Sequence, residues 1–370
     1  MSNQQDTKKK NPNVPTLRFG IGGQKRPLRD VVVFPKSTAS CPKNIYISTE
    51  NLKQDFQGFV AYQDNSLSKG ISFKEGDTLF ANIRPYLKKA FLASFNGCCS
   101  PDVICFRPAG ILPGYLYYAI ANEHFTDHVM EACKGSKMPR GDRSWMLQKE
   151  IFVPSEEEQM KVVSFLRLID QRIETQNKII NEVSSLINPL FDAYHKNLEA
   201  ERFSLCDLAV IKKGEQVNAD VMSEENEIPM LNGGTSPSGF FTKSNRGSDT
   251  ITISEGGNSC GYISFMTVPF WAGGHCYTVH PINRQRIHNR YLYFLLKRQE
   301  TRIMALRVGS GLPNIQKKDL ESFSLSVPSL DQQERIAQKL NIVASKLSLE
   351  QNLLDSLRHL KQFLLKNMFI

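Results

Sequence analysis

The fold is decided by a stretch with a regular apolar repeat, VPSEEEQMKVVSFLRLIDQRIETQNKII, at residues 153–180. A second stretch, VPSLDQQERIAQKLNIVASKLSLEQNLL, occupies residues 327–354 and starts in the same way 174 residues later. Ser155 with Glu158, and Ser329 with Gln332, each fit a capping box, in which the serine side chain accepts from the N3 amide while the N3 side chain reaches back to the N-cap amide. We therefore predict two long helices that begin by the same device.

Apolar residues recur along both stretches at alternating steps of three and four. This repeat of 3.5 residues gives a seam narrow enough to pack against one partner helix, as in a coiled coil, and the obvious partner of each helix is the other copy. The step missing from each series is polar, Gln176 in one and Glu350 in the other. The first series is Leu166, Ile169, Ile173, Ile180, Val183, Ile187, Leu190 and Tyr194, and the second is Leu340, Val343, Leu347, Leu354, Leu357, Lys361, Leu364 and Met368.

Length and composition set the class of protein. A chain of 370 residues with 41% hydrophobic content can form two globular domains besides these helices. No apolar run reaches the ~20 residues of a membrane span, and the Lys-rich N-terminus has no signal-peptide core, so we expect a cytoplasmic protein with no membrane partner. Eight cysteines without a C-x-x-C pair indicate reduced thiols. His275, Cys276 and His280 lack a fourth ligand at a sensible spacing, and we expect no metal site.

The net charge of +9 is unevenly distributed. Residues 156–201 carry nine acids and five bases, and residues 331–370 carry four acids and six bases, so the two helices sum to −2 and the rest of the chain to +11. An excess of positive charge on the globular parts points to nucleic acid.

The globular parts repeat one order of motifs. Residues 1–16 form an expected disordered basic tail, residues 17–152 a first domain, 153–200 a helix, 201–326 a second domain, and 327–370 a second helix. In the first domain we predict strands at 31–34, 45–48, 78–83, 90–95 and 103–106, followed by one helix from Pro113 to about Cys133. The second domain follows at offsets of 172 to 177, and its Gly-Ser-Gly-Leu-Pro loop at 309–313 answers Gly-Ser-Lys-Met-Pro at 135–139. The predicted fold class is α+β, two tandem mixed domains of mostly antiparallel strands from one internal duplication.

Several strings in this order resemble the DNA specificity subunit of a type I restriction-modification system, over essentially the whole chain. They are Val-Pro-Thr-Leu-Arg-Phe at 14–19, Gly-Asp-Thr-Leu at 76–79, Ile-Arg-Pro-Tyr-Leu at 83–87, the two Gly-Ser-x-x-Pro loops, and the two Val-Pro-Ser helix starts with Glu158-Gln159 and Gln332-Gln333-Glu334. The Gly-Ile-Gly-Gly that follows Phe19 departs from the family's usual Pro-Gly-Phe.

The resemblance implies two target-recognition domains, each reading one half of a split site in double-stranded DNA, held apart by an antiparallel helix pair with pseudo-twofold symmetry. The helices would also dock modification (adenine methyltransferase) subunits, expected to be two, with restriction subunits when these are present. S-adenosylmethionine, ATP and magnesium would be cofactors of those partners and not of this chain. A helix of ~41 residues is ~60 Å long, the scale of ~18 base pairs, so the helix pair would act as a ruler.

The chain shows no catalytic constellation. It has no Pro-Pro for an adenine methyltransferase loop and no Walker loop for ATP, so we expect no catalytic residue. Gly257-Asn258-Ser259-Cys260-Gly261 fits the G-x-S-x-G nucleophile elbow, but the residues after it alternate as a strand where the elbow needs a helix. Three alternatives remain open: a stand-alone DNA-binding scaffold of this architecture, the specificity subunit of another multisubunit restriction system, and a hydrolase built on Ser259.

Recognition chemistry is expected from basic and amide side chains on loops. In the first domain the candidates are Arg84, Tyr86, Lys88, Lys89, Lys134, Lys137, Arg140 and Arg143. In the second they are Lys212, Lys213, Lys243, Asn245, Arg246, Arg307, Asn314, Lys317 and Lys318.

The polar residues of the seam carry a further expectation. In an antiparallel pair, residues near the midpoint meet their own counterparts, so Gln176 should lie within about a turn of Glu350. Two polar side chains in an apolar seam lower stability but fix the register.

Overall fold

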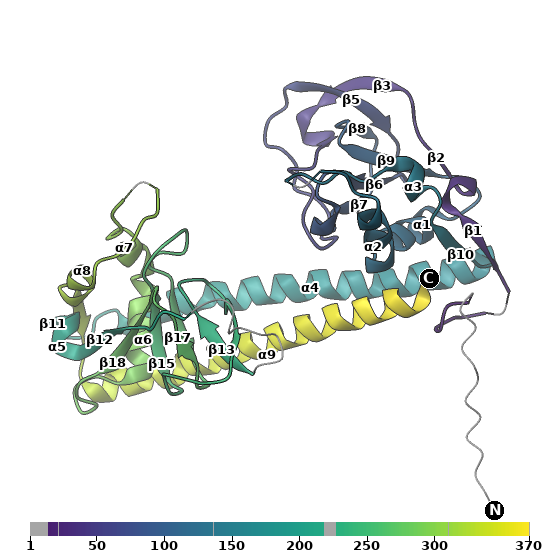
Figure 1. Ribbon diagram of the computed structural model, residues 1–370. Coiled ribbons are helices and arrows are strands. Elements are labelled where there is room, and N and C mark those ends of the chain that lie inside the picture. The colour runs from purple at the N-terminus through teal and green to yellow at the C-terminus, as the bar shows by residue number, and fades with distance from the viewer. Residues whose placement is uncertain (1–13, 21, 136, 218–226, 310, 370) are drawn as a thin grey trace, which may run out of the picture. The chain divides into compact units, whose positions relative to one another are not determined.

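The computed structural model describes residues 14–20, 22–135, 137–217, 227–309 and 311–369. The chain divides into two compact units, the first formed by Met1–Asn177 with Asn352–Ile370 and the second by Lys178–Gln351. Each unit contains one globular domain and a half of each long helix (Figure 1). Most of the expected tail lies outside the described residues, but Pro15 is buried and Leu17 N donates to Asn367 O (2.9 Å), so Pro15 belongs to the folded first unit.

The first unit contains two four-stranded sheets and a short two-stranded ribbon. One sheet has the order β2-β9-β6-β7 and is antiparallel throughout, whereas the other, β3-β5-β8-β4, contains the parallel pair β4 and β8. The ribbon pairs β1 with β10. The strands are β1 Gln24–Pro27, β2 Val32–Val33, β3 Thr38–Pro42, β4 Tyr46–Ile47, β5 Leu67–Phe73, β6 Thr78–Ala81, β7 Ala90–Leu92, β8 Gly97–Cys99, β9 Val103–Pro108 and β10 Glu150–Val153. Short 3-10 turns occur at η1 Leu28–Asp30, η2 Lys43–Ile45 and η3 Pro85–Leu87.

The single helix predicted after these strands is wrong. The structure has α1 Pro113–Ile120 and α2 Glu123–Glu131, separated at Asn122, and a short α3 Arg143–Met146. Asn122 caps α2, because its Oδ1 accepts from Phe125 N (3.0 Å), and its Nδ2 donates to Tyr118 O (2.9 Å) at the end of α1. One asparagine therefore ends one helix and starts the next.

The second unit repeats the first antiparallel sheet in the same order, β12-β18-β15-β16. A three-stranded sheet, β14-β13-β17, and the ribbon β11 with β19 complete it. The strands are β11 Glu201–Ser204, β12 Ala209–Lys213, β13 Ile228–Leu231, β14 Gly239–Phe241, β15 Thr250–Ser254, β16 Ile263–Met266, β17 Trp271–Ala272, β18 Cys276–Pro281 and β19 Ser324–Val327. The helices are α5 Leu205–Leu208, α6 Asn289–Arg298, α7 Glu300–Met304 and α8 Lys317–Glu321. The repeated strand order and register confirm the duplication predicted from the sequence.

The two long helices are α4 Glu156–His195 and α9 Leu330–Met368 (Figure 1). Every residue of the predicted seam is buried or half-buried. In the first unit Lys361 of α9 pairs with Asp170 of α4 (2.6 Å), and in the second Lys339 of α9 lies over the Tyr194 ring of α4 (4.2 Å). The contacts therefore run in opposite directions along the two helices, which confirms an antiparallel pair. Gln176 and Glu350 are both buried, and their expected juxtaposition stays a prediction.

The starts of the two helices share the predicted cap only in part. Glu158 N donates to Ser155 Oγ (3.3 Å) in α4, whereas Ser329 N donates to Gln332 Oε1 (3.2 Å) before α9. Among the described atoms each helix thus forms one arm of the capping box. Glu158 is instead used by Arg18, whose Nη2 lies 2.6 Å from its carboxylate.

A continuous apolar core attaches each domain to its part of the helix pair. In the first unit, Phe106 of the sheet and Tyr115 of α1 belong to one buried cluster with Leu166 of α4 and Leu364 of α9. The second unit has the corresponding cluster, which joins Val279, Tyr291, Phe191 and Leu340. Helix α1 or α6 therefore forms the middle layer between a sheet and the long helices, and burial of this layer holds the domain's loops in a fixed frame. No helix among the described residues is long and apolar enough to span a membrane.

Candidate nucleic-acid interface

Each domain joins two loops into one structure, which we call its loop pair. The first loop pair consists of residues 82–89, directly after β6, and 134–141, the first Gly-Ser-x-x-Pro loop. Arg84 N donates to Pro139 O (2.8 Å) and Gly141 N to Asn82 O (3.2 Å). Ser136 in this pair, and Ser310 in the other, lie outside the described residues.

The second loop pair, residues 255–262 and 308–315, repeats these bonds. Gly257 N donates to Pro313 O (2.9 Å) and Ile315 N to Glu255 O (2.9 Å). Within the Gly-Ser-x-x-Pro loops, Lys134 and Arg140 exchange two backbone hydrogen bonds in one domain, and Val308 and Asn314 do the same in the other. Backbone geometry therefore makes residues of the two loop pairs equivalent, at an offset of 173 in the first loop and 174 in the second.

The equivalent loops differ in which residues occupy left-handed backbone. In the first loop pair Arg84 and Lys88 have φ of 51° and 52°. The equivalent residues of the second are Gly257 and Gly261, with φ of 74° and 87°. Glycine adopts this region without steric cost, whereas a side chain costs roughly 1–2 kcal/mol. The first domain thus places two basic side chains where the backbone disfavours any side chain.

Most candidate residues of the first domain meet in its loop pair. Lys88 pairs with Glu123 (2.6 Å), Arg140 with Asp102 (3.1 Å), and Lys134 with Asp142 (3.4 Å). Lys89 Nζ donates to Thr49 O (2.7 Å). The exposed members are Arg84, Tyr86, Lys134, Lys137 and Arg140, together with Arg143, which follows the second loop.

In the second domain two of the candidates are built into the fold. Arg246 is largely buried and donates to Thr278 Oγ1 (3.2 Å) and to Lys213 O (3.0 Å). Asn245 exchanges two hydrogen bonds with the backbone of Ala272 in β17. Because their polar atoms bind the domain's own strands, these two side chains position the sheet edge, and contact with DNA stays a prediction for all of the candidates. The exposed candidates are Lys212, Lys213, Lys243, Arg307, Asn314, Lys317 and Lys318.

A buried acid at the base of the second loop pair was not predicted. Glu255 accepts from Lys213 Nζ (2.6 Å) and from Tyr277 OH (3.0 Å), and its other oxygen lies 3.4 Å from His275 Nδ1. Burial, and then the charge of Glu255, raise the pKa of Tyr277. His280 Nε2 is bonded to Thr278 Oγ1 (2.9 Å) and Cys276 is buried, so the string His275, Cys276, His280 points in different directions. No group of three metal-ligating side chains is found among the described residues.

Two glutamines connect the domains to the long helices, and their role was also missed. Gln159 Oε1 accepts from Leu112 N (2.9 Å), the residue before α1, and its Nε2 donates to Pro154 O (3.0 Å). Gln333, 174 residues later, accepts from His288 N (2.9 Å) and donates to Pro328 O (2.9 Å) and Arg286 O (3.1 Å). The matching Gln at one offset was visible in the sequence, but its backbone partners were not.

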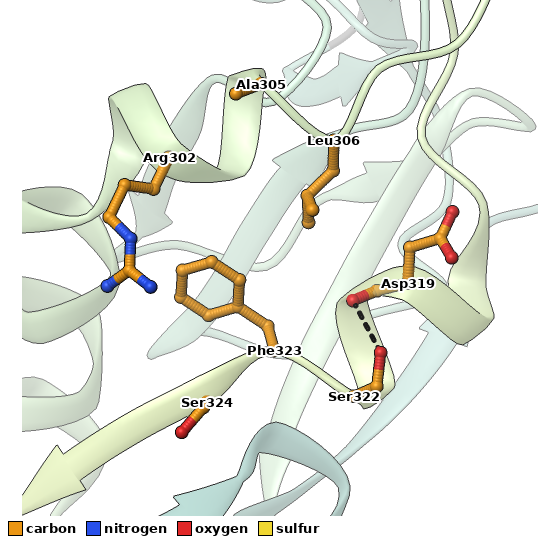
Figure 2. Close-up of a pocket in the computed structure, with 7 residues that line it drawn as sticks. All are labelled: Arg302, Ala305, Leu306, Asp319, Ser322, Phe323 and Ser324. Atoms are coloured by element: carbon orange, nitrogen blue, oxygen red, sulfur yellow. Dashed lines mark hydrogen bonds between the residues drawn. The ribbon is translucent and has the colours of Figure 1, made fainter.

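A hydrolase would need a nucleophile and its base together in a surface hollow. Figure 2 shows one in the second unit, where Phe323 lies beneath Arg302 and Ser322 Oγ donates to the backbone oxygen of Asp319 (3.2 Å). Ser322 therefore has a backbone acceptor where a nucleophile needs a base. Ser259 likewise bonds Ser254 Oγ (3.2 Å), in a turn that leads into strand β16, so the geometry of a nucleophile elbow is not formed.

A second exposed feature lies on the long helices. Large apolar side chains face solvent at positions related by 174: Leu168 and Ile342 are 63% and 73% exposed, and Leu186 and Leu360 are 51% and 44% exposed. An exposed apolar residue alone needs no explanation, but its recurrence in both copies describes two equivalent surfaces.

The chain thus carries two copies of an α+β domain on a heptad helix pair, with basic residues exposed on the domains. These features define a class of protein that recognises two sites with two copies of one domain. The model of the type I restriction modification DNA specificity domain matches residues 22–185 and again 197–359. The chain belongs to this family.

Relatives and solved structures agree with this assignment. A putative type I specificity subunit of Mycoplasma genitalium is 28% identical over 184 residues, 48% of each chain. The EcoDI specificity subunit of Escherichia coli is 23% identical over 166 residues, 44% of this chain and 37% of the relative. The matched region thus spans less than half the length of these relatives. The crystal structure of a type I restriction-modification S subunit from M. genitalium shares the fold, with a TM-score of 0.62 at 19% identity over 96% of this chain and 99% of that one.

Proposed function

We propose that this chain is a DNA specificity subunit that reads a bipartite site in double-stranded DNA, one half-site with each domain. The observation that carries the proposal is the repetition of one loop-pair frame on two domains of the same sheet order. A duplicated reader held on an antiparallel helix pair suits a site whose halves are read from the two strands.

In this proposal the partner subunits, and not this chain, carry out the chemical reactions. The exposed apolar positions that recur on both long helices give two equivalent docking surfaces, so we propose two modification subunits, one at each, with restriction subunits joining the assembly. The modification subunits would methylate adenine with S-adenosylmethionine, and ATP and magnesium would serve the restriction subunits. This chain would select the DNA site, and the partner subunits would carry out the reaction.

The test compares the purified chain with the chain plus its modification subunits. We expect S-adenosylmethionine-dependent methylation of DNA only in the second case. A double variant, Leu168→Asp with Ile342→Asp, should abolish co-purification of the modification subunits while leaving the chain folded, and Gln351→Asp on an exposed position of α9 is the matched control. Methylation by the chain alone would contradict the proposal.

A further inference from the structure

The two loop pairs have one backbone frame but opposite charge. Residues 82–89 and 134–141 contain six bases (Arg84, Lys88, Lys89, Lys134, Lys137, Arg140) and no acid, a formal charge of +6. Residues 255–262 and 308–315 contain no Lys or Arg and one acid, Glu255, a formal charge of −1. The contrast lies between equivalent positions, so it is not a consequence of where the loops sit in their domains.

Neighbouring acids reduce this contrast without removing it. Glu123, Asp102 and Asp142 pair with Lys88, Arg140 and Lys134, which leaves the first loop pair at +3. In the second pair Lys213 offsets Glu255, and Arg307, the residue before the second loop, adds one base, which leaves it at about +1 and still below the first. Exposed pairs of this kind are weak, so the paired bases remain available to a phosphate that approaches them.

Arg84 is the centre of the first loop pair. Its backbone amide holds the other loop through Pro139, and its side chain is exposed and makes no hydrogen bond or ion pair among the described residues. It keeps left-handed φ and ψ of 51° and 60°, where the second domain has a glycine. A strained residue with a free cationic side chain, in a frame that glycine would relax, points to a function for that side chain.

We propose that the first loop pair is a phosphate clamp centred on Arg84, and that the second domain holds its half-site without an equivalent clamp. The inference rests on the proposed DNA-reading function. It assigns to the two half-sites an unequal dependence on salt, because each phosphate neutralised by a cation releases counterions.

The experiment measures binding of the full chain, with the modification subunits that co-purify with it, to several double-stranded DNAs of unrelated sequence, each over a range of salt concentrations. Arg84→Ala should weaken binding several-fold at low salt for all sequences and make the negative slope of log K against log salt less steep by about one. Lys74→Ala is the matched control, because Lys74 is exposed and precedes β6 whereas Arg84 follows it. It should leave the slope unchanged.

Two glycine variants separate charge from folding. Arg84→Gly should show the same loss of binding with an unchanged or higher melting temperature, because glycine suits this backbone. Gly257→Arg should make the negative slope steeper by about one, since a Cβ at Gly257 would meet no atom within 4 Å and its backbone strain is of the kind that Arg84 already bears. An Arg84→Ala slope equal to that of Lys74→Ala, in a complex that still binds DNA, would overturn the clamp alone. A loss of binding confined to one DNA sequence would also overturn the clamp, because it would assign Arg84 to the edge of a base. A complex that binds no DNA would overturn the proposed function as well.

Discussion

The two loop pairs differ in composition far more than in backbone. Both are closed by the same hydrogen bonds, from Arg84 to Pro139 in one domain and from Gly257 to Pro313 in the other, although the two donor residues share neither charge nor size. The part that the two copies share is therefore the peptide frame, because backbone bonds require no particular side chain. Recognition chemistry can then change in one domain while the other stays as it is.

The two domains should be exchangeable independently of each other. Exchanging residues 201–326 for the corresponding segment of a relative should change one half of the methylated site completely and leave the other half unaltered. Sequencing of modified adenines in the host genome measures both halves at once. A change in both halves would show that the domains do not read independently.

A buried ion pair distinguishes the first domain from the second. Arg107 of β9 binds Asp77 through two bonds of 2.7 and 2.9 Å, and Asp77 is buried, whereas Thr250, which takes the position of Asp77 in the strand register of the second domain, carries no charge. Asp77 raises the pKa of Arg107 by this hydrogen bonding. Arg107→Ala should cost about 3 kcal/mol of unfolding free energy, because it leaves a buried carboxylate uncompensated.

The control for this prediction is His280→Ala, the equivalent position of β18, which should cost clearly less. Chemical denaturation followed by circular dichroism gives both values. Equal losses of unfolding free energy in the two variants would mean that the ion pair between Arg107 and Asp77 adds no stability of its own to the first unit.

The glutamines at the starts of the two long helices differ in the number of hydrogen bonds that they make. Gln333→Leu removes three hydrogen bonds and leaves the part-buried amide of His288 without its acceptor, whereas Gln159→Leu removes two and does the same to the amide of Leu112. We expect losses of about 3 and about 2 kcal/mol, since an unsatisfied buried group costs roughly 1–3 kcal/mol. Denaturant midpoints compare the two variants, and Gln351→Leu, on an exposed position of α9, should be near neutral. If Gln159→Leu lowered the unfolding free energy more than Gln333→Leu, the number of hydrogen bonds would not explain the difference between the two variants.

The smallest effect concerns pH. Burial lowers the pKa of His195, His280 and His288, all in the second unit. A histidine with a lowered pKa is held neutral in the folded state, so its contribution to stability is complete above the unfolded pKa of about 6.5 and declines as the pH falls below that value. His195, stacked on Phe191, should account for part of this decline.

His195→Phe keeps a stacked ring but cannot be protonated. It should therefore reduce the loss of stability between neutral and mildly acidic pH, by less than about 1 kcal/mol. Melting curves at several pH values measure this slope. A slope identical to that of the unchanged chain would show that His195 does not titrate on unfolding.

The sequence predicted best those features that follow a regular spacing of apolar residues. The seam from Leu166 to Tyr194, and its copy, were predicted residue by residue because a heptad pattern needs only spacing. The break at Asn122 was missed because an asparagine between two apolar helical segments signals a boundary only when its cap bonds are seen. The strand that follows Ser259 was predicted, since alternation is also periodic.

The loop pairs could be predicted only in part. The basic residues were chosen by type, and six of them do come together, but nothing in the sequence showed that Arg84 and Gly257 occupy the same left-handed position. That equivalence depends on backbone bonds between segments more than 50 residues apart. Asn245 and Arg246 show the converse, since side chains of the right type are used by the fold itself.

The left-handed position shared by Arg84 and Gly257 has a consequence at the level of codons. A glycine codon becomes an arginine codon by a change of its first base, and the frame described above accepts both residues. One point mutation can therefore add or remove a cation at this place without inserting residues or rebuilding a loop. Under the proposed function, lineages of this protein could change the DNA affinity of either domain by single substitutions, while the backbone bonds of its loop pair stay the same.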